Sequence, residues 1–463
     1  MQIKLAGYNI DTKLIEKLGK DVSATPEVIS AAYARISRSS KSVTELRSIA
    51  ANDVEKARNS NWEIVFEMGH ASVAEHAVFN FDIIGISRYL AEFIQRSRLA
   101  SFTEKSQRYV TLDGDFVLPA EIEGSRYKDD FANLMQNAFA LYSNLFEDLK
   151  LQKASECEWN SKRELEGAAK EDARYVLPLC TRTQMGMTIN ARSLELLLRR
   201  LATLPLKEAQ ELHQLLYGEV SKVAPSIVRF VQADDFITRT LPSQLAIKSI
   251  PSTINEVKLV DFTFHADAHI LSGLLFEQQG GSYPDILKQV KAMGNKQQKA
   301  LWQDFFEGIK PWHKMPRAFE LADFVFELTM SASCYAQFKR HRLCTILKAP
   351  YNAKDGFVIP PSIQKPAQVK AIKALLSSAE SLATKVSKGN PMLYPYLLTN
   401  AHRVRILAKM NLRELYHFSR LRSDSHAQWE IQQLSNQLIP IVQKRCPNAA
   451  QWLMGKSDFP VDI

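Results

Sequence analysis

The stretch that decides the fold occurs twice, first as FNFDIIGISRYLAEFIQRSRLASFTEKSQRYVTLDGDFVLPAEI from Phe79 and again as FVFELTMSASCYAQFKRHRLCTILKAPYNAKDGFVIPPSI from Phe324. Each begins with apolar residues at alternate positions, which predicts a half-buried β-strand. Each continues through Ser87 or Ser331 into a stretch with helical spacing, and serine is a favoured N-cap. Each predicted helix ends in an Arg-x-Arg triplet, and each segment closes on a short strand that leads to proline.

The likeness extends in both directions along the chain. Upstream, IKLAGYNID near Ile3 matches VKLVDFTFHAD from Val257. Downstream, MTINARSLELLLRRL with Asn190 matches AKMNLRELYHFSRLR with Asn411. Because these anchors follow in the same order, we expect two unequal tandem copies of one fold.

The predicted boundaries are a first copy at residues 1–238, a linker at 239–255 and a second copy at 256–463. The segment between the copies is rich in Pro, Ser and Thr, as linkers are. Short strands mix with long helices without regular βαβ alternation, which predicts an α+β fold. Each copy is expected to contain a mixed or antiparallel sheet with long helices.

Composition bounds the function only loosely. The 59 Lys and Arg exceed the 50 Asp and Glu, so the formal charge of +9 is a mild basic bias without basic runs. This bias fits anionic small molecules and nucleic acid about equally well. Without basic runs the nucleic-acid footprint is weak, so nucleic acid is not expected as a partner. No apolar stretch is long enough for a membrane span, and the N-terminus has no signal-peptide pattern. The five cysteines form no CxxC pair, so we expect reduced thiols in a cytoplasmic protein and no metal site.

Five motifs carry a family resemblance: GHASVAEH from Gly69, RSRLASFTEKSQRY from Arg96, EDARYVLP from Glu171, QFKRHR from Gln337 and NLRELYHFSRLRSDSHAQWEI from Asn411. Together they resemble the signature of the flavin-dependent thymidylate synthases, the ThyX family. The long C-terminal motif is highly specific. The Arg-His-Arg triplet alone would be weak, because basic residues are common at helix ends.

The resemblance implies conversion of dUMP to dTMP with FAD as cofactor and NADPH and methylenetetrahydrofolate as co-substrates. Family members are homotetramers with sites shared between subunits, and they use no cysteine nucleophile. A chain with two copies is therefore expected to form a homodimer. Two alternatives stay open: a non-catalytic flavin- or nucleotide-binding paralogue, and the same chemistry on another pyrimidine nucleotide.

Neither copy keeps the full family pattern. In the first copy, the triplet histidine, the glutamine before it and the uracil-side arginine are replaced by Ser97, Phe93 and Leu201. In the second copy, the substrate-loop Glu, Ser and Arg are replaced by Lys348, Pro350 and Asn352. The losses do not overlap, so we expect one composite site built from unlike copies.

The resemblance assigns roles to the retained residues. It implies catalytic roles for Arg422 and Ser106. It implies that substrate is bound by Glu104, Ser106, Arg108, Arg174, Gln337, Arg340 and Arg422. It implies that the cofactor is bound by His70, Arg340, His341, Arg342, Asn411, Arg413, His417 and His426.

Ordinary chemistry explains these residue types. A phosphate favours arginine and hydroxyl donors, and charge that develops on a reduced uracil ring favours a fixed arginine. Arg422 and His426 lie four apart in the sequence, which predicts one shared helical face. Arg174 also has an ordinary interpretation, as an ion pair with Glu171 or Asp172.

Overall fold

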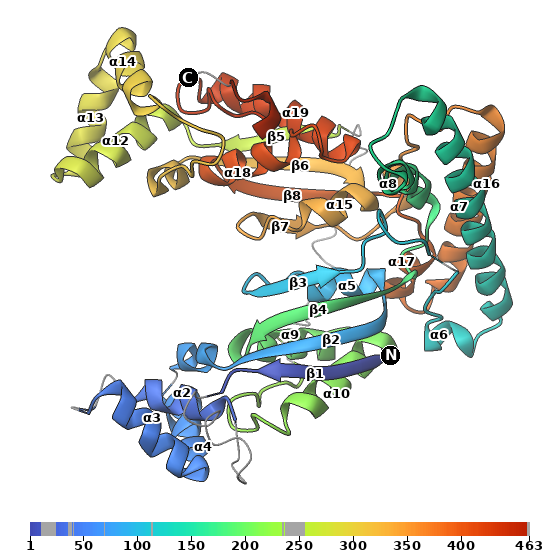
Figure 1. Ribbon diagram of the computed structural model, residues 1–463, viewed down its shortest axis with the longest axis horizontal. Coiled ribbons are helices and arrows are strands. Elements are labelled where there is room, and N and C mark those ends of the chain that lie inside the picture. Colours follow the sequence, from blue (N-terminus) through green and yellow to red (C-terminus); the bar gives the residue numbers. More distant parts are fainter. Residues whose placement is uncertain are drawn as a thin grey trace. The chain divides into compact units, whose positions relative to one another are not determined.

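The fold centres on two four-stranded antiparallel sheets, each in its own compact unit of the computed structural model (Figure 1). One unit comprises Met1–Ser249 with Ser362–Thr399, and the other comprises Ile250–Pro361 with Asn400–Ile463. The structure describes residues 1–10, 25–35, 39, 41–68, 70–112, 114–233, 236 and 255–460. The predicted linker lies outside the described residues except for Asn255.

The two sheets share one topology. The first has the order β1-β2-β4-β3 and the second β5-β6-β8-β7. Register shifts fall at matching places, between Leu5 and Gly7 in the first sheet and between Leu259 and Asp261 in the second. The strands are β1 (Gln2–Tyr8), β2 (Val78–Ser87), β3 (Ala100–Glu104), β4 (Arg182–Asn190), β5 (Val257–Phe262), β6 (Asp323–Ser331), β7 (Thr345–Lys348) and β8 (Arg403–Asn411). The predicted α+β class with two similar halves is confirmed.

The serine caps lie where the sequence predicts them. The Ser87 side chain accepts from the backbone N–H of Leu90 and opens α5 (Arg88–Ile94), and Ser331 does the same for Cys334 and α15 (Ala332–Phe338). In each unit a buried glutamate, Glu208 or Glu430, accepts hydrogen bonds from both the backbone N–H and the hydroxyl of that serine.

Two local predictions need correction. The helices end before the Arg-x-Arg triplets, which lie in the turns that follow. The closing strands predicted before the prolines are reduced to single bridges, Phe116 with Thr181 and Phe357 with His402. Both deviations place the triplets and the loops after them in irregular backbone, where side-chain direction cannot be inferred from a regular period.

In the first unit, α9 (Ala191–Thr203) and α10 (Lys207–Val220) pack together and against β4 and β1 (Figure 1). A small helical cluster with its own apolar core lies between β1 and β2 in the sequence. Its members are α2 (Glu27–Ala34), α3 (Val43–Asn52), α4 (Val54–Trp62), the π-helix η2 (Glu63–Glu67) and the 3₁₀-helix η3 (Ala71–His76).

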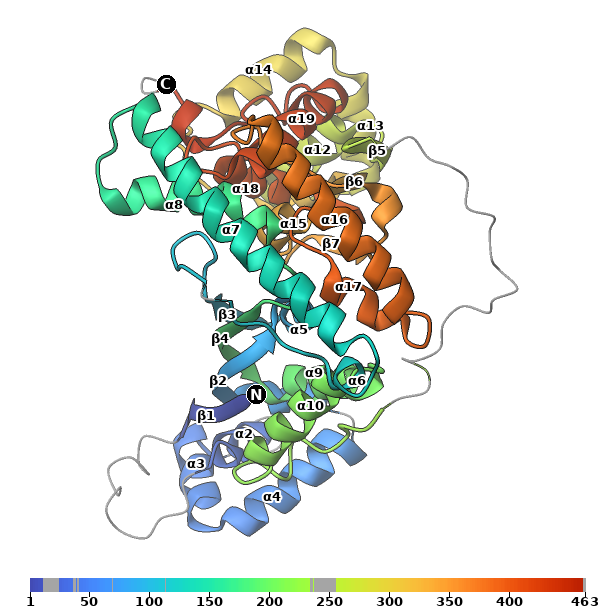
Figure 2. The same cartoon turned by 90° about the vertical axis from the view of Figure 1, so that its right-hand side faces the viewer.

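The remaining helices of the first unit form a bundle that crosses the predicted copies. Figure 2 shows α16 beside α7, and Gln368 Nε2 donates to the Asp148 carboxylate at 2.7 Å between them. Residues 362–399 thus pack with the first unit, although in sequence they belong to the second copy. The elements are α6 (Ala120–Glu123), α7 (Lys128–Glu156), α8 (Lys162–Ala173), η4 (Arg174–Val176), α16 (Pro366–Val386), η8 (Pro391–Leu393) and α17 (Tyr394–Leu397).

In the second unit, α18 (Leu412–Arg422) and α19 (Trp429–Arg445) pack together, with α18 against β8 and α19 against β5. Three helices again lie between the first two strands in sequence: α12 (Ala266–Gln279), α13 (Tyr283–Ala292) and α14 (Asn295–Phe305). Short 3₁₀ turns complete the unit: η6 (Arg317–Leu321), η7 (Ala353–Asp355) and η9 (Lys456–Asp458). No described helix is long and apolar enough to cross a membrane.

Candidate functional site

The first unit brings its predicted substrate residues together around Glu171. Arg108 follows β3 in the loop that Ser106 opens, and the Ser106 hydroxyl accepts from the Arg108 backbone N–H at 3.2 Å. Arg108 Nε lies 2.5 Å from the Glu171 carboxylate. Arg174, at the end of α8, donates from Nε to the Glu171 backbone carbonyl at 3.2 Å. Arg88, Arg108 and Arg174 with their carboxylates Glu104 and Glu171 are called the arginine cluster below.

Glu104 is anchored beside this cluster. It accepts hydrogen bonds from Gln95 at 2.8 Å and from Thr183 at 3.2 Å, and it lies 3.8 Å from Arg88. Its carboxylate therefore holds neighbouring side chains of its own unit in place.

The arginine cluster carries more positive than negative charge in a buried place. Burial lowers the pKa of Arg174, and the nearby cations Arg108 and Arg88 lower it further, whereas Glu171 raises it. Burial raises the pKa of Glu171, which Arg108 and Arg174 counteract. Three arginines against two carboxylates make this cluster a place where an additional anion would be stabilised. Glu171, one of the two ion-pair partners considered for Arg174, has its carboxylate against the Arg108 guanidinium, and Arg174 bonds to its backbone carbonyl.

His70 lies apart from these residues in the sequence and is exposed at the start of η3. Gly69, the first residue of its motif, lies outside the described residues. His70 is the N-cap residue of η3, and its carbonyl accepts from the backbone N–H of Val73 at 3.1 Å. Its cofactor role stays a prediction.

The second unit connects four polar residues in one chain of hydrogen bonds. The His341 Nδ1 lies 3.1 Å from the Glu414 carboxylate, and Arg422 Nε donates to His341 Nε2 at 3.0 Å. Arg422 also donates to the side-chain oxygen of Gln337 at 3.5 Å and to its backbone carbonyl at 3.3 Å. We call Gln337, His341, Glu414 and Arg422 the His341 network. It joins the turn after α15 to both ends of α18.

The partners of His341 determine which ring nitrogen carries the proton. An arginine can only donate, so Nε2 must accept and the proton of the neutral ring resides on Nδ1, facing the Glu414 carboxylate. His341 is 3% exposed. Burial lowers its pKa, with further lowering from Arg422 and His417, whereas Glu414 raises it. A protonated ring would place an N–H against the Arg422 N–H, so the neutral state preserves the network.

Acid is therefore expected to destabilise the second unit through His341. The unfolded residue titrates near 6.5 and the folded residue lower. Below about pH 6.5 the unfolded chain binds a proton at His341 that the folded chain does not. The contribution of neutral His341 to the free energy of unfolding is therefore fully present above pH 6.5 and is lost as the pH falls through the folded pKa. Urea unfolding of wild type and His341→Gln between pH 7.5 and 5 gives the free energy of unfolding at each pH. The effect is the difference between the two proteins in the slope of this free energy against pH. Identical pH slopes in the two proteins would contradict it.

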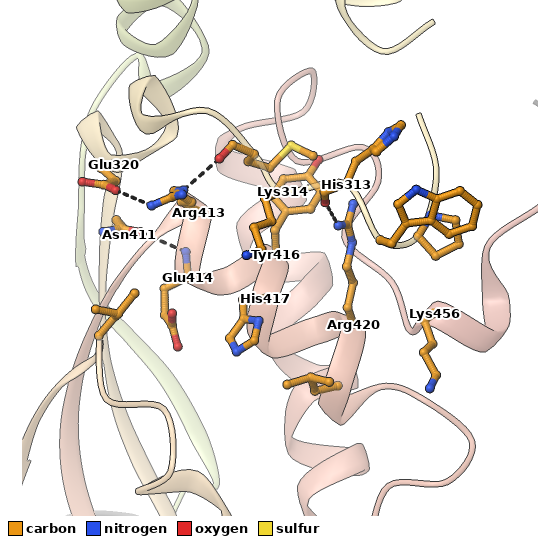
Figure 3. Close-up of a pocket in the computed structure, with 15 residues that line it drawn as sticks. His313, Lys314, Glu320, Asn411, Arg413, Glu414, Tyr416, His417, Arg420 and Lys456 are labelled. Atoms are coloured by element: carbon orange, nitrogen blue, oxygen red, sulfur yellow. Dashed lines mark hydrogen bonds and ion pairs between the residues drawn. The ribbon is translucent and has the colours of Figure 1, made fainter. Parts of the chain in front are cut away.

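A cavity of about 410 Å³ opens beside the network in the second unit (Figure 3). Arg413 lies on its wall, where it donates from Nε to the Met315 carbonyl at 2.8 Å and pairs with Glu320 at 2.8 Å. Asn411 caps α18 by accepting from the Glu414 backbone N–H at 2.9 Å. We call this cavity the Arg413 pocket; it is lined by Pro311, Trp312, His313, Lys314, Met315, Glu320, Leu343, Asn411, Arg413, Glu414, Tyr416, His417, Arg420, Leu421 and Lys456.

Other predicted residues of the second unit are less closely tied to these groups. Arg340 and Arg342 are exposed on either side of buried His341. The expected helical face shared by Arg422 and His426 is wrong, because α18 ends at Arg422. His426 lies in the following turn with its side chain 87% exposed, 2.9 Å from the Asp424 carboxylate.

Sequence reasoning did not predict site roles for Arg88 and Glu171 of the arginine cluster, Glu414 of the His341 network or Arg420 of the Arg413 pocket. Glu171 stands inside a motif quoted for its arginine. Glu414 follows the N-cap Asn411 by three residues, so it resembles half of a capping box. Arg420 lies between the motif positions of the Asn-x-Arg helix. No local signal in one sequence separates these roles from ordinary helix chemistry.

Two buried cysteine thiols, Cys180 and Cys446, lie in settings that disfavour the thiolate. Burial raises the pKa of Cys180 and Cys446, and Asp267 raises that of Cys446 further. All five cysteines are free. Among the described residues, no group of three His, Cys, Asp or Glu side chains is placed to hold a metal ion.

Comparison with known proteins places the chain in a family. The family model described as "Thymidylate synthase complementing protein" matches residues 20–226 and 276–448. A flavin-dependent thymidylate synthase of Clostridium tetani is 32% identical over 225 residues, 48% of this chain and 86% of the relative. A UPF0159 protein of Thermoplasma acidophilum is 24% identical over 448 residues, 86% of this chain and 89% of the relative. A solved UMP/dUMP methylase of Streptomyces cacaoi is 20% identical, with a TM-score of 0.35 over 50% of this chain and 93% of its own.

The family model and the Clostridium tetani relative place the chain in the class of flavin-dependent methyltransferases. The chain belongs to the ThyX family of flavin-dependent thymidylate synthases, because the family model covers well over half of its residues. The predicted family resemblance is confirmed. One matched stretch falls within each predicted copy.

Proposed function

We propose that this chain methylates dUMP to dTMP, with FAD as cofactor and methylenetetrahydrofolate and NADPH as co-substrates. The observation that carries the proposal is the fixed Arg422. Its guanidinium is held by His341 and Gln337 near a pocket that contains Asn411 and Arg413. A donor whose direction is set before substrate arrives stabilises developing charge without reorganisation.

The residues of the Arg413 pocket suit a flavin nucleotide. Trp312, Leu343 and Leu421 on its wall are 74%, 75% and 45% exposed, and they offer apolar contact to a planar ring. Asn411 and Arg413 add polar groups on the same wall. Arg420 brings a buried cation whose Nε and Nη2 have no hydrogen-bond partner in the described part of the chain. A ligand with both a flat ring and an anionic arm meets these needs. When bound, the flavin supplies the reducing equivalents for methylation.

The chain's own residues then bind and orient. Ser106, Arg108 and Arg174 take the dUMP phosphate, and the two arginines give up part of their contact with Glu171 to do so. Arg422 directs its N–H groups to a uracil carbonyl, where charge grows as the ring is reduced. Glu414 acts through His341: it keeps the ring proton on Nδ1, so that Nε2 remains an acceptor for Arg422.

We also infer that the chain arose by tandem duplication and that one site per chain is composite. The matching strand orders and the matching ion pairs Glu75–Arg192 and Glu320–Arg413 support the duplication. The composite site follows from the non-overlapping losses. A homodimer of these 52.5 kDa chains would contain the four copies of the family homotetramer.

The decisive test is formation of dTMP by the purified, FAD-loaded protein supplied with dUMP, methylenetetrahydrofolate and NADPH. We expect dTMP, NADPH oxidation that depends on dUMP, and rescue of a thymidine-requiring bacterial strain. A protein that binds FAD and dUMP but forms no dTMP under these conditions would refute the enzyme and leave a binding paralogue.

A further inference from the structure

Arg420 is a buried cation whose hydrogen-bonding capacity is only partly used by the described residues. It is 9% exposed, and its Nη1 donates to the carbonyl of His313. Its Nε and Nη2 are buried and have no hydrogen-bond partner among the residues that the structure describes. The rings of Tyr416 and Phe459 each lie 5.7 Å from its guanidinium carbon. These cation–π contacts compensate part of the positive charge. Ring faces do not satisfy the remaining N–H groups, and a buried charge without partners is costly.

The matching arginine of the first copy has the carboxylate that Arg420 lacks. Counting from the N-caps Asn190 and Asn411, position nine is Arg199 in the first copy and Arg420 in the second. Arg199 pairs with Glu195 one turn earlier at 3.2 Å. The residue one turn before Arg420 is Tyr416. The same helix therefore neutralises its arginine internally in one copy and not in the other.

The surroundings of Arg420 favour a negatively charged ligand group. Figure 3 shows it on the wall of the Arg413 pocket, with Lys456 also on that wall. The two carboxylates that line the pocket are engaged elsewhere, Glu320 by Arg413 and Glu414 by His341. An arginine fork matches phosphate oxygens in geometry as well as charge.

We propose that Arg420 forms a phosphate-binding subsite of the Arg413 pocket, which takes the pyrophosphate arm of a dinucleotide cofactor while the apolar wall contacts its ring. The inference rests on the proposed flavin function and deepens it. It assigns this residue to cofactor choice: a flavin with a pyrophosphate binds tightly, and riboflavin, which has no phosphate, binds weakly.

The test compares wild type, Arg420→Met and the matched control Arg199→Met. Titration of FAD and riboflavin against each protein is followed by flavin fluorescence. We expect Arg420→Met to weaken FAD binding roughly 10- to 100-fold, the loss of one charge-assisted contact, and to leave riboflavin binding unchanged. Arg199→Met should bind both flavins as wild type does.

A second readout needs no flavin. Sodium pyrophosphate should raise the Tm of wild type and of Arg199→Met but not that of Arg420→Met, because a ligand stabilises only the state that binds it. Without ligand, Arg420→Met should have an unchanged or higher Tm, since it removes a buried charge. Arg420→Lys, which keeps the charge and loses the fork, should give intermediate affinities, and it serves if the methionine variant does not fold.

The outcomes separate the subsite from the function. Equal losses for FAD and riboflavin, or no loss for FAD, would overturn the subsite and leave the flavin enzyme standing. Weaker dUMP binding in Arg420→Met would assign the subsite to the substrate phosphate and overturn the cofactor assignment. A wild type that binds no flavin, with pyrophosphate stabilisation that depends on Arg420, would refute the proposed function and keep the subsite.

Discussion

Arg422→Ala is expected to lower kcat/KM for dUMP roughly 30- to 1000-fold, on the order of 2–4 kcal/mol of transition-state stabilisation. The physical reason is that Arg422 lies at the end of the His341 network, which holds its guanidinium rigidly. His341 and Gln337 fix its direction, and Glu414 fixes His341. Alanine removes the donor and leaves His341 Nε2 without its partner. Turnover should be measured as dTMP formed per folded, flavin-loaded chain.

Leu201→Ala is the matched control for Arg422→Ala. The first copy has Ser97, Ser193 and Leu201 at the positions of His341, Glu414 and Arg422, so all three partners are absent there together. Leu201 is 1% exposed, and its truncation should cost about 2–5 kcal/mol of stability without changing turnover per folded chain. Normal turnover in Arg422→Ala, or equal turnover losses in both variants, would show that the His341 network stabilises the fold and plays no part in catalysis.

Arg108→Met is expected to weaken dUMP binding by a similar factor, roughly 30- to 1000-fold, with the loss seen mainly in KM. Arg108 lies beside Arg174 in the arginine cluster, where the excess of cations would stabilise the substrate phosphate. Deoxyuridine, which lacks the phosphate, should bind wild type and variant equally. Calorimetry with both ligands measures the difference.

The Arg108→Met experiment needs a control for Glu171, the carboxylate that pairs with Arg108. Removing Arg108 leaves Glu171 with one cation fewer, and that alone can disturb the cluster. The double variant Arg108→Met/Glu171→Gln removes that charge. It should still bind dUMP weakly if Arg108 contacts the phosphate. Recovery of dUMP affinity in the double variant would contradict the assignment, and Asn352→Ala, at the matching position of the second copy, should have no effect.

Local patterns predicted the sheets because their determinants lie within a few residues. Alternating apolar positions identified β2 and β6, and Ser87 and Ser331 opened the helices as expected. The ends of elements were less predictable. The stop of α18 at Arg422 places His426 in a turn, where the cap Ser423 bonds to Ser435 of α19. That bond is distant in sequence, so a helical wheel cannot show it.

Contacts between distant segments could not be predicted from one sequence. Nothing in the pattern of α16 indicates that it packs with α7 of the other copy. Glu414 resembles a capping residue until the fold brings His341 to it, 73 residues away in sequence. Within its own helix, Arg420 has Tyr416 one turn earlier where Arg199 has Glu195. The sequence shows this difference, but its relation to the Arg413 pocket is visible only in the fold.

The central claim is that two unlike copies form one dUMP site per chain. Isothermal calorimetry of the FAD-loaded protein with dUMP tests it most directly, with active protein concentration fixed by bound flavin and chain mass. The account predicts saturation at one dUMP per chain, with that single site weakened in Arg108→Met and unable to turn dUMP over in Arg422→Ala. Two equivalent dUMP sites per chain, each surviving one of these substitutions, would contradict it.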